Sequence, residues 1–242
     1  MSLDEIQQKK QLIESRSRIR EFVFGIQDGL ISTVGLLAGI QSATENNIVV
    51  IVTGLTAMFS GAISMAAGSY LSSKAQKEIF DKEIAEAERL AEREPYMVAE
   101  GLLKALGEEG LSKEQSYRMV KVLIQQRNVF LRTFQEKVFG LGSAEINRPM
   151  QAALIMGLSF IVGAIVPILP YVLLSGLRAL YSSTLLGGLT LFGVGAFKGV
   201  LAGQSPVLSG LKFFLIAVGA AVLGFAIGMV VQYFFPGVAI PG

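Results

Sequence analysis

The stretch that decides the fold is Gly25-Ile-Gln-Asp-Gly-Leu-Ile-Ser-Thr-Val-Gly-Leu-Leu-Ala-Gly39. It is apolar enough to cross a membrane, yet it contains Asp28, whose carboxylate costs about 2.5 to 3.5 kcal/mol to place at bilayer depth. One face of the expected helix carries its small and polar residues at helical spacing: Gly25, Asp28, Ser32, Gly35 and Gly39. Small residues let a second helix approach closely. We therefore expect Asp28 to face a protein interior or a water-filled path.

The next apolar run carries a matching face of small residues and thioethers: Gly54, Met58, Gly61, Met65 and Gly68. A carboxylate on one helix and sulfur ligands on its neighbour would suit ferrous iron better than calcium or magnesium, which take oxygen ligands. Alternatively, the two glycine-rich faces pack together and the methionines fill gaps. The residues alone leave both interpretations of Met58 and Met65 open.

The composition is that of a membrane protein, with 52% hydrophobic residues and a mean hydropathy of +0.55. The net charge of +2 is too small to indicate a nucleic-acid partner. Cys and His are absent, so metal or proton chemistry must use carboxylates, thioethers, hydroxyls and carbonyls. Nothing resembles a nucleophile and base pair or a phosphate-binding loop, and we do not expect an enzyme.

These patterns predict an all-α integral membrane protein with five transmembrane helices and a cytoplasmic three-helix insert between the second and third spans. A span needs about 20 apolar residues. The expected spans are about 22–42, 48–71, 150–174, 180–201 and 207–234. The expected parts of the chain are an N-terminal amphipathic helix at 1–21, the first two spans at 22–71, the insert at 72–148, and the last three spans at 149–242.

Within the insert, the second span continues as a helix until Pro95 stops it. A short helix at 96–106 and a third helix at 113–139, opened by a capping box at Ser112, complete the insert. The protruding helix presents clustered carboxylates, which are common ligands of divalent ions. The alternative is a solvated, salt-bridged face, with Glu78 and Lys82 as a favourable i, i+4 pair.

Lys and Arg concentrate in the N-terminal segment, the insert and the connection from Lys198 to Lys212. By the positive-inside rule these segments are cytoplasmic and the C-terminus is outside. Lys198 either snorkels to the interface or pairs with a buried acid. The membrane is a plasma membrane if the source is a prokaryote, and a vacuolar membrane is also compatible.

Four stretches together resemble the vacuolar iron transporter family: 24–30, 61–68 with Tyr70 and Ser72 after it, 149–153, and 167–170. The resemblance covers nearly the whole chain from Ile19 onward. It implies a homodimer of five-span subunits with an ion path along the first two helices at the dimer axis. It also implies that Asp28 and Met65 hold the transmembrane metal, and that the insert is a cytoplasmic metal-binding domain that uses glutamates. Family members move Fe²⁺, and sometimes Mn²⁺, out of the cytoplasm, in several cases against protons.

The chain departs from the family pattern at Ser69, where the family usually has a glutamate before the tyrosine. A hydroxyl is a weaker, neutral ligand, so Ser69 alters the ion preference or the proton coupling. The expected transmembrane path comprises Asp28, Met65, Met58, Ser32 and Ser69. The glutamates carried over to the insert site are Glu83, Glu86, Glu94, Glu100 and Glu136.

The sequence therefore predicts a transporter that moves a divalent transition metal, Fe²⁺ or also Mn²⁺, out of the cytoplasm by proton antiport. Its expected partners are a second copy of the chain, the lipid bilayer, metal ions and protons. Two other classes remain open. One is a membrane-anchored protein that binds or senses metal without transport, and the other is a small cation channel.

Overall fold

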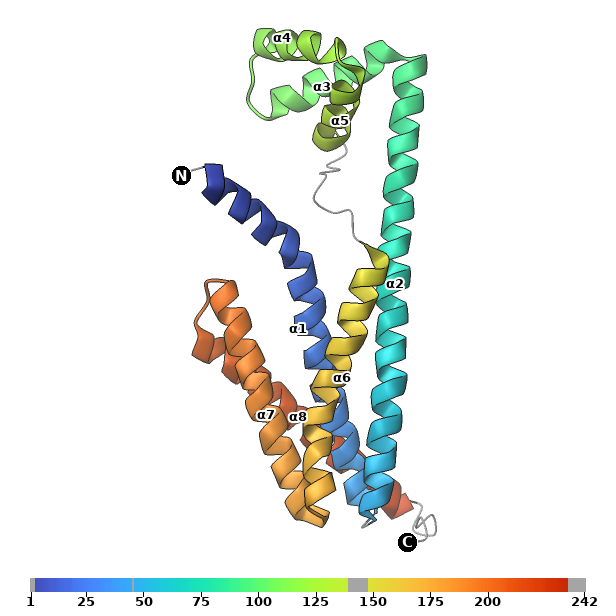
Figure 1. Cartoon of the computed structure of the whole chain (residues 1–242), viewed down its shortest axis with the longest axis vertical. Coiled ribbons are helices and arrows are strands. Elements are labelled where there is room, and N and C mark those ends of the chain that lie inside the picture. The colour runs from blue at the N-terminus through green and yellow to red at the C-terminus, as the bar shows by residue number, and fades with distance from the viewer. Residues whose placement is uncertain (1–2, 45, 139–147, 235–242) are drawn as a thin grey trace. The chain divides into compact units, whose positions relative to one another are not determined.

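The computed structural model describes residues 3–44, 46–138 and 148–234, and these ranges are helical apart from short connections. Five of the helices are long and apolar enough to cross a membrane (Figure 1): α1 Leu3–Ala43, α2 Asn47–Arg93, α6 Pro149–Leu173, α7 Gly176–Leu201 and α8 Pro206–Phe234. In α1 the part that is long and apolar enough to cross a membrane lies within Ile19–Ala43. The prediction of an all-α membrane protein with five spans is confirmed.

The chain divides into two compact units. One contains Met1–Leu71 and Pro149–Gly242, and therefore holds the apolar segments of all five long helices. The other is Ser72–Arg148. The helix α1 runs without a break from the N-terminal segment into the first span, because no proline or glycine interrupts the sequence before Gly25.

The unit that contains Met1–Leu71 and Pro149–Gly242 is called the membrane unit below. Its central helix is α1, which packs against α6, α7 and α8. Glycines make two of these contacts close. A Cβ placed on Gly25 would lie 2.6 Å from the carbonyl oxygen of Met156 in α6. Further along, Gly35 and Gly39 meet the backbone of Gly224 in α8. Such close approach lets van der Waals packing hold the helices together where lipid supplies no hydrophobic driving force.

Two side chains donate three hydrogen bonds to the last part of α6 and the residue after it. The Asn47 Nδ2 group donates to the carbonyl oxygens of Tyr171 and Leu174, the latter at 3.0 Å. The Ser183 hydroxyl of α7 donates to the carbonyl oxygen of Pro167 at 2.6 Å. Asn47 thus satisfies carbonyl groups at the C-terminus of α6, which have no partner within the helix. The helix continues through Pro167 and Pro170 to Leu173.

The second unit contains the end of α2 and three shorter helices, α3 Pro95–Glu108, α4 Lys113–Ile124 and α5 Arg127–Val138. Its core is a cluster of apolar side chains from all four: Ala87, Val98, Leu102, Leu106, Val120, Phe130 and Phe134. The predicted capping box is confirmed, with the Gln115 N–H donating to Ser112 Oγ at 3.3 Å and the Ser112 N–H donating to Gln115 Oε1 at 2.9 Å.

The prediction of one long helix at 113–139 is wrong, and the insert has four helical parts where the sequence predicted three. The helix breaks at Gln125 and Gln126, where the Gln126 carbonyl starts α5 by accepting from Val129 and Phe130. Both α4 and α5 pack on α3, which has 14 residues and is therefore about 21 Å long. A straight helix through 113–139 would be about 40 Å long and could not bring both halves onto it.

The glycine contacts of α1 predict a difference between two matched substitutions. Gly25→Ala should lower the melting temperature, because the new methyl group meets the Met156 carbonyl and overpacking typically costs about 1–3 kcal/mol. Gly193→Ala in α7 is the control, since nothing lies within 4 Å of that position. Both changes gain the same helix propensity. Equal melting temperatures for the two purified variants would contradict the α1–α6 packing.

Candidate functional site

The Asp28 side chain is half-buried, and Ser32, one turn further along α1, is exposed. The Ser32 hydroxyl donates to the backbone carbonyl of Asp28 at 2.6 Å, which fixes its rotamer and leaves its oxygen lone pairs available. No ion pair in the described part of the chain involves Asp28, so the alternative in which Lys198 pairs with it is not what the structure shows. The first span thus carries an unpaired carboxylate.

A second acid on the same helix was missed by the sequence analysis. Glu21 is only 7% exposed, and its carboxylate lies 3.1 Å from Arg20 Nη2. The expected first span begins at residue 22, so Glu21 lies just outside it. The signal that would have found it is spacing, since Glu21 and Asp28 are seven residues apart and share a helix face about 10 Å apart along the axis.

The glycine and methionine face of α2 packs within the same chain. Gly61 lies against the Phe160 ring of α6, where a Cβ would come within 2.6 Å of Cε1. Gly54 lies against Leu37 and Ile168 in the same way. Met58 is 3% exposed and belongs to this apolar cluster. This part of the face is therefore occupied by side chains of α1 and α6.

Toward the other end of the same face the environment changes. Met65 is half-buried at the edge of the cluster, and Ser69 is half-buried as well. Gly68 has no atom within 4 Å of a Cβ placed on it. Of the α2 residues predicted for the ion path, Met65 and Ser69 are thus open to a further ligand, whereas Met58 is enclosed by apolar side chains.

The opposite side of α2 is exposed in the single chain. In the apolar part of α2 only 22% of the residues are buried, compared with 56% in the apolar part of α6. The exposed side chains repeat at helical spacing along the span: Ile48, Val52, Leu55, Phe59 and Ile63. This apolar face meets either lipid or another protein surface.

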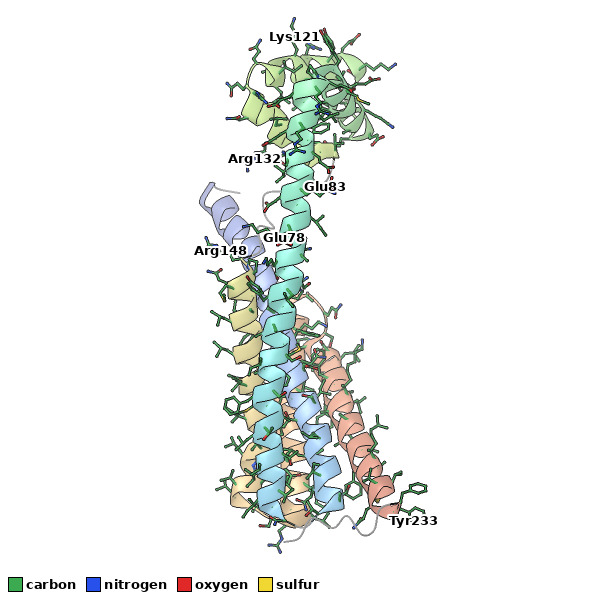
Figure 2. All side chains as sticks on the ribbon, turned by 90° about the vertical axis from the view of Figure 1, so that its right-hand side faces the viewer. Glu78, Glu83, Lys121, Arg132, Arg148 and Tyr233 are labelled. Carbon is green, nitrogen blue, oxygen red and sulfur yellow. The ribbon has the colours of Figure 1, made fainter. Side chains whose placement is uncertain are left out.

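In the insert, the five predicted glutamates do not converge. Glu83 is half-buried on α2, while Glu86, Glu94, Glu100 and Glu136 are exposed on α2, at the start of α3, on α3 and on α5. Among the side chains that the structure describes, which begin at Ile19, no group of three or more acidic residues is placed to hold a metal ion. Figure 2 shows charged side chains, including Glu83 and Arg132, projecting from these helices.

Ion pairs engage several acids of the insert. Lys82 pairs with Glu86 at 3.5 Å, and Glu78 pairs with Lys74 at 3.8 Å, so the pairing expected between Glu78 and Lys82 is replaced by two neighbouring pairs. Between helices, Glu92 binds Arg127 at 2.6 Å. Lys137 binds Glu109 at 2.8 Å, and this hydrogen bond raises the pKa of the Lys137 ammonium group. The alternative of a solvated, salt-bridged face therefore describes much of this surface in one subunit.

Comparison with known proteins identifies one family. The model of the VIT family matches residues 19–229. Vacuolar iron transporter 1 of Arabidopsis thaliana is 26% identical over 216 residues, which cover 89% of this chain and 86% of the relative. The vacuolar iron transporter of Centaurea cyanus is 27% identical over 212 residues, covering 87% and 86%. That of Plasmodium falciparum (isolate 3D7) is 26% identical over 230 residues, covering 90% and 83%.

The two methionines of the α2 face should respond differently to truncation. Met58→Ala should lower stability by about 2–5 kcal/mol, because it leaves a cavity in the apolar cluster. Met65→Ala should cost clearly less, because Met65 lies at the edge of that cluster. The melting temperatures of the two variants in one detergent check this. Equal losses would assign Met65 to the core and remove it as a candidate ligand.

Proposed function

The chain belongs to the VIT family, and we propose that it transports Fe²⁺, and also Mn²⁺, out of the cytoplasm in exchange for protons. The observation that carries this proposal is Asp28, a half-buried carboxylate without an ion-pair partner on an apolar span. A charge at bilayer depth is costly and typically marks an ion pathway. The family membership is the reason for proposing iron as the transported metal, since the relatives named above are iron transporters.

We propose that two copies of the chain form the path. In one copy, α6 and α8 cover the glycine faces of α1, while Ser32 is exposed and one side of α2 is uncovered. A second copy related by twofold symmetry would cover these surfaces and bring two Asp28 carboxylates toward one axis. Two carboxylates would neutralise one divalent cation. The half-buried Met65 and Ser69 would add neutral ligands, and a thioether favours Fe²⁺ over magnesium and calcium.

The same arrangement of two Asp28 carboxylates gives a reason why protons would be exchanged for the metal ion. When the metal ion leaves, two carboxylates facing each other at bilayer depth need another cation, because like charges at close range in a low dielectric are strongly unfavourable. The proton is the cation that carboxylates bind directly. Glu21, on the same face as Asp28 and nearer the N-terminus, would be the next carboxylate along the path.

For the orientation, we propose that the N-terminus, the insert and the α7–α8 connection are cytoplasmic, and that the C-terminus is outside. The distribution of Lys and Arg among the connections supports this arrangement. With the insert on the cytoplasmic side, its glutamates would collect metal before transport. Since one subunit does not bring them together, we propose that Glu83 and Glu86 bind metal jointly with the insert of the partner subunit.

Asp28→Asn tests the transmembrane site. The amide keeps the size and hydrogen bonding of the side chain but removes the charge that offsets a dehydrated cation, so Fe²⁺ uptake into proteoliposomes should fall to background. The melting temperature should stay equal or rise, because an unpaired buried charge has been removed. Both quantities are measured on the same preparation, with and without a pH gradient.

Two controls make that result specific. Asp81→Asn removes a carboxylate from the exposed part of α2 outside the membrane unit and should leave the flux unchanged. Asp28→Glu keeps the charge and should retain part of the flux. An Asp28→Asn protein with lower stability but normal Fe²⁺ flux per folded molecule would rule out Asp28 as a ligand. Fe²⁺ flux that follows the Fe²⁺ gradient alone, whatever the pH gradient, would indicate a channel.

The proposed metal site of the insert is tested in the full-length protein carrying Asp28→Asn, so that the membrane site does not contribute. Adding Glu83→Gln with Glu86→Gln should weaken Mn²⁺ binding at least tenfold, as measured by electron paramagnetic resonance. The control pair is Glu108→Gln with Glu114→Gln, which removes two exposed charges from the same unit. Equal Mn²⁺ binding by both double variants would show that the metal binds elsewhere. If the Asp28→Asn protein itself binds no Mn²⁺, the glutamates form only a solvated, salt-bridged surface.

A further inference from the structure

A cavity of about 420 Å³ lies between α1 and the end of α7. Its walls are largely apolar and include Val23, Phe24 and Leu201. Two basic residues also line it, Arg20 from α1 and Lys198 from α7. This cavity is not part of the proposed ion path, because its cationic side chains would repel a divalent metal ion.

The connectivity places the cavity at one membrane boundary. Arg20 lies just before the apolar run that begins at Phe22, and Lys198 lies three residues before the end of α7. With five spans, the start of the first and the end of the fourth lie on the same side of the bilayer. The two cations therefore lie at the level of the lipid headgroups, and the apolar walls continue toward the hydrocarbon.

The charges around the cavity favour a monoanion. Arg20 pairs with the buried Glu21 at 3.1 Å, so these two side chains together are neutral. Lys198 makes no ion pair in the described part of the chain, and its Nζ lies 5.2 Å from the centre of the Phe213 ring. The ring supports a cation without neutralising it. One positive charge remains for a ligand, which matches a single phosphodiester.

We propose that this cavity binds one anionic phospholipid, such as phosphatidylglycerol, in each subunit. The phosphate lies between Lys198 and Arg20, and the first part of an acyl chain lies against Val23, Phe24 and Leu201. Basic pockets between transmembrane helices at the cytoplasmic boundary are a known means of binding anionic headgroups. The apolar walls select a lipid over a free phosphate. The bound lipid contacts both α1 and α7 at this cavity.

Native mass spectrometry of the full-length protein in detergent tests this. Titration with dioleoylphosphatidylglycerol should show a first bound lipid per subunit at lower concentration than titration with dioleoylphosphatidylcholine. Lys198→Gln should weaken this first event about fivefold, the effect of one basic residue near an anionic surface. Lys212→Gln is the matched control, because Lys212 is exposed on α8 at the same boundary and does not line the cavity. Arg20 is left unchanged because its removal would leave the buried Glu21 carboxylate without its ion-pair partner.

A second variant tests the apolar part. Val23→Phe keeps both cations but narrows the apolar side of the cavity, and should weaken the first binding event of the anionic lipid without loss of folded protein. Inorganic phosphate at equal concentration should not displace the lipid. The proposal is overturned if both lipids bind equally, if Lys198→Gln behaves like Lys212→Gln, if Val23→Phe binds the anionic lipid as tightly as the parent protein, or if phosphate displaces it.

Discussion

Close packing of α1 against α6 and α8 determines where the polar residues of the first span can lie. Gly25 and Gly29 bring the backbone of α1 against α6, and Gly35 and Gly39 bring it against α8. These contacts occupy the glycine faces of the helix. Asp28 and Ser32 remain on a part of the surface that no helix of the same chain seals. The glycines therefore do more than hold the bundle together, because they fix the direction of the carboxylate.

The surface properties of α2 follow from its position at the edge of the membrane unit. An exposed apolar face on a span is stable in lipid and needs no partner by itself. An open carboxylate on the neighbouring span is different, because hydrocarbon cannot solvate it. The acid of α1 is thus the reason for the second copy that we propose, and the apolar side of α2 supplies a surface that such a copy can cover.

The sequence predicts the parts of this protein that depend on local pattern. Hydropathy and length place each of the five spans within one long helix, and the capping box at Ser112 is correct in both of its hydrogen bonds. The break at Gln125 was not predictable, because neither residue of Gln125-Gln126 is a helix breaker and the cause is the packing of two helices on α3. Glu21 was missed because it lies just outside the predicted span, and local pattern does not show that its side chain is buried. The packing partner of Gly61 was also beyond local pattern, since its contact is Phe160, 99 positions away.

Charge balance links the substitution at Ser69 to the rest of the path. Glu21 is already neutralised by Arg20, and Ser69 contributes no charge where the family resemblance implies a carboxylate. Each subunit then brings one uncompensated negative charge, Asp28, to the proposed path. A dimer brings two, which balance one divalent cation and leave no charge for a second cation in the same dry region. On this account the path holds one metal ion at a time, or up to two protons in its place, and the neutral ligands Met65 and Ser69 affect which metal is preferred without changing that count.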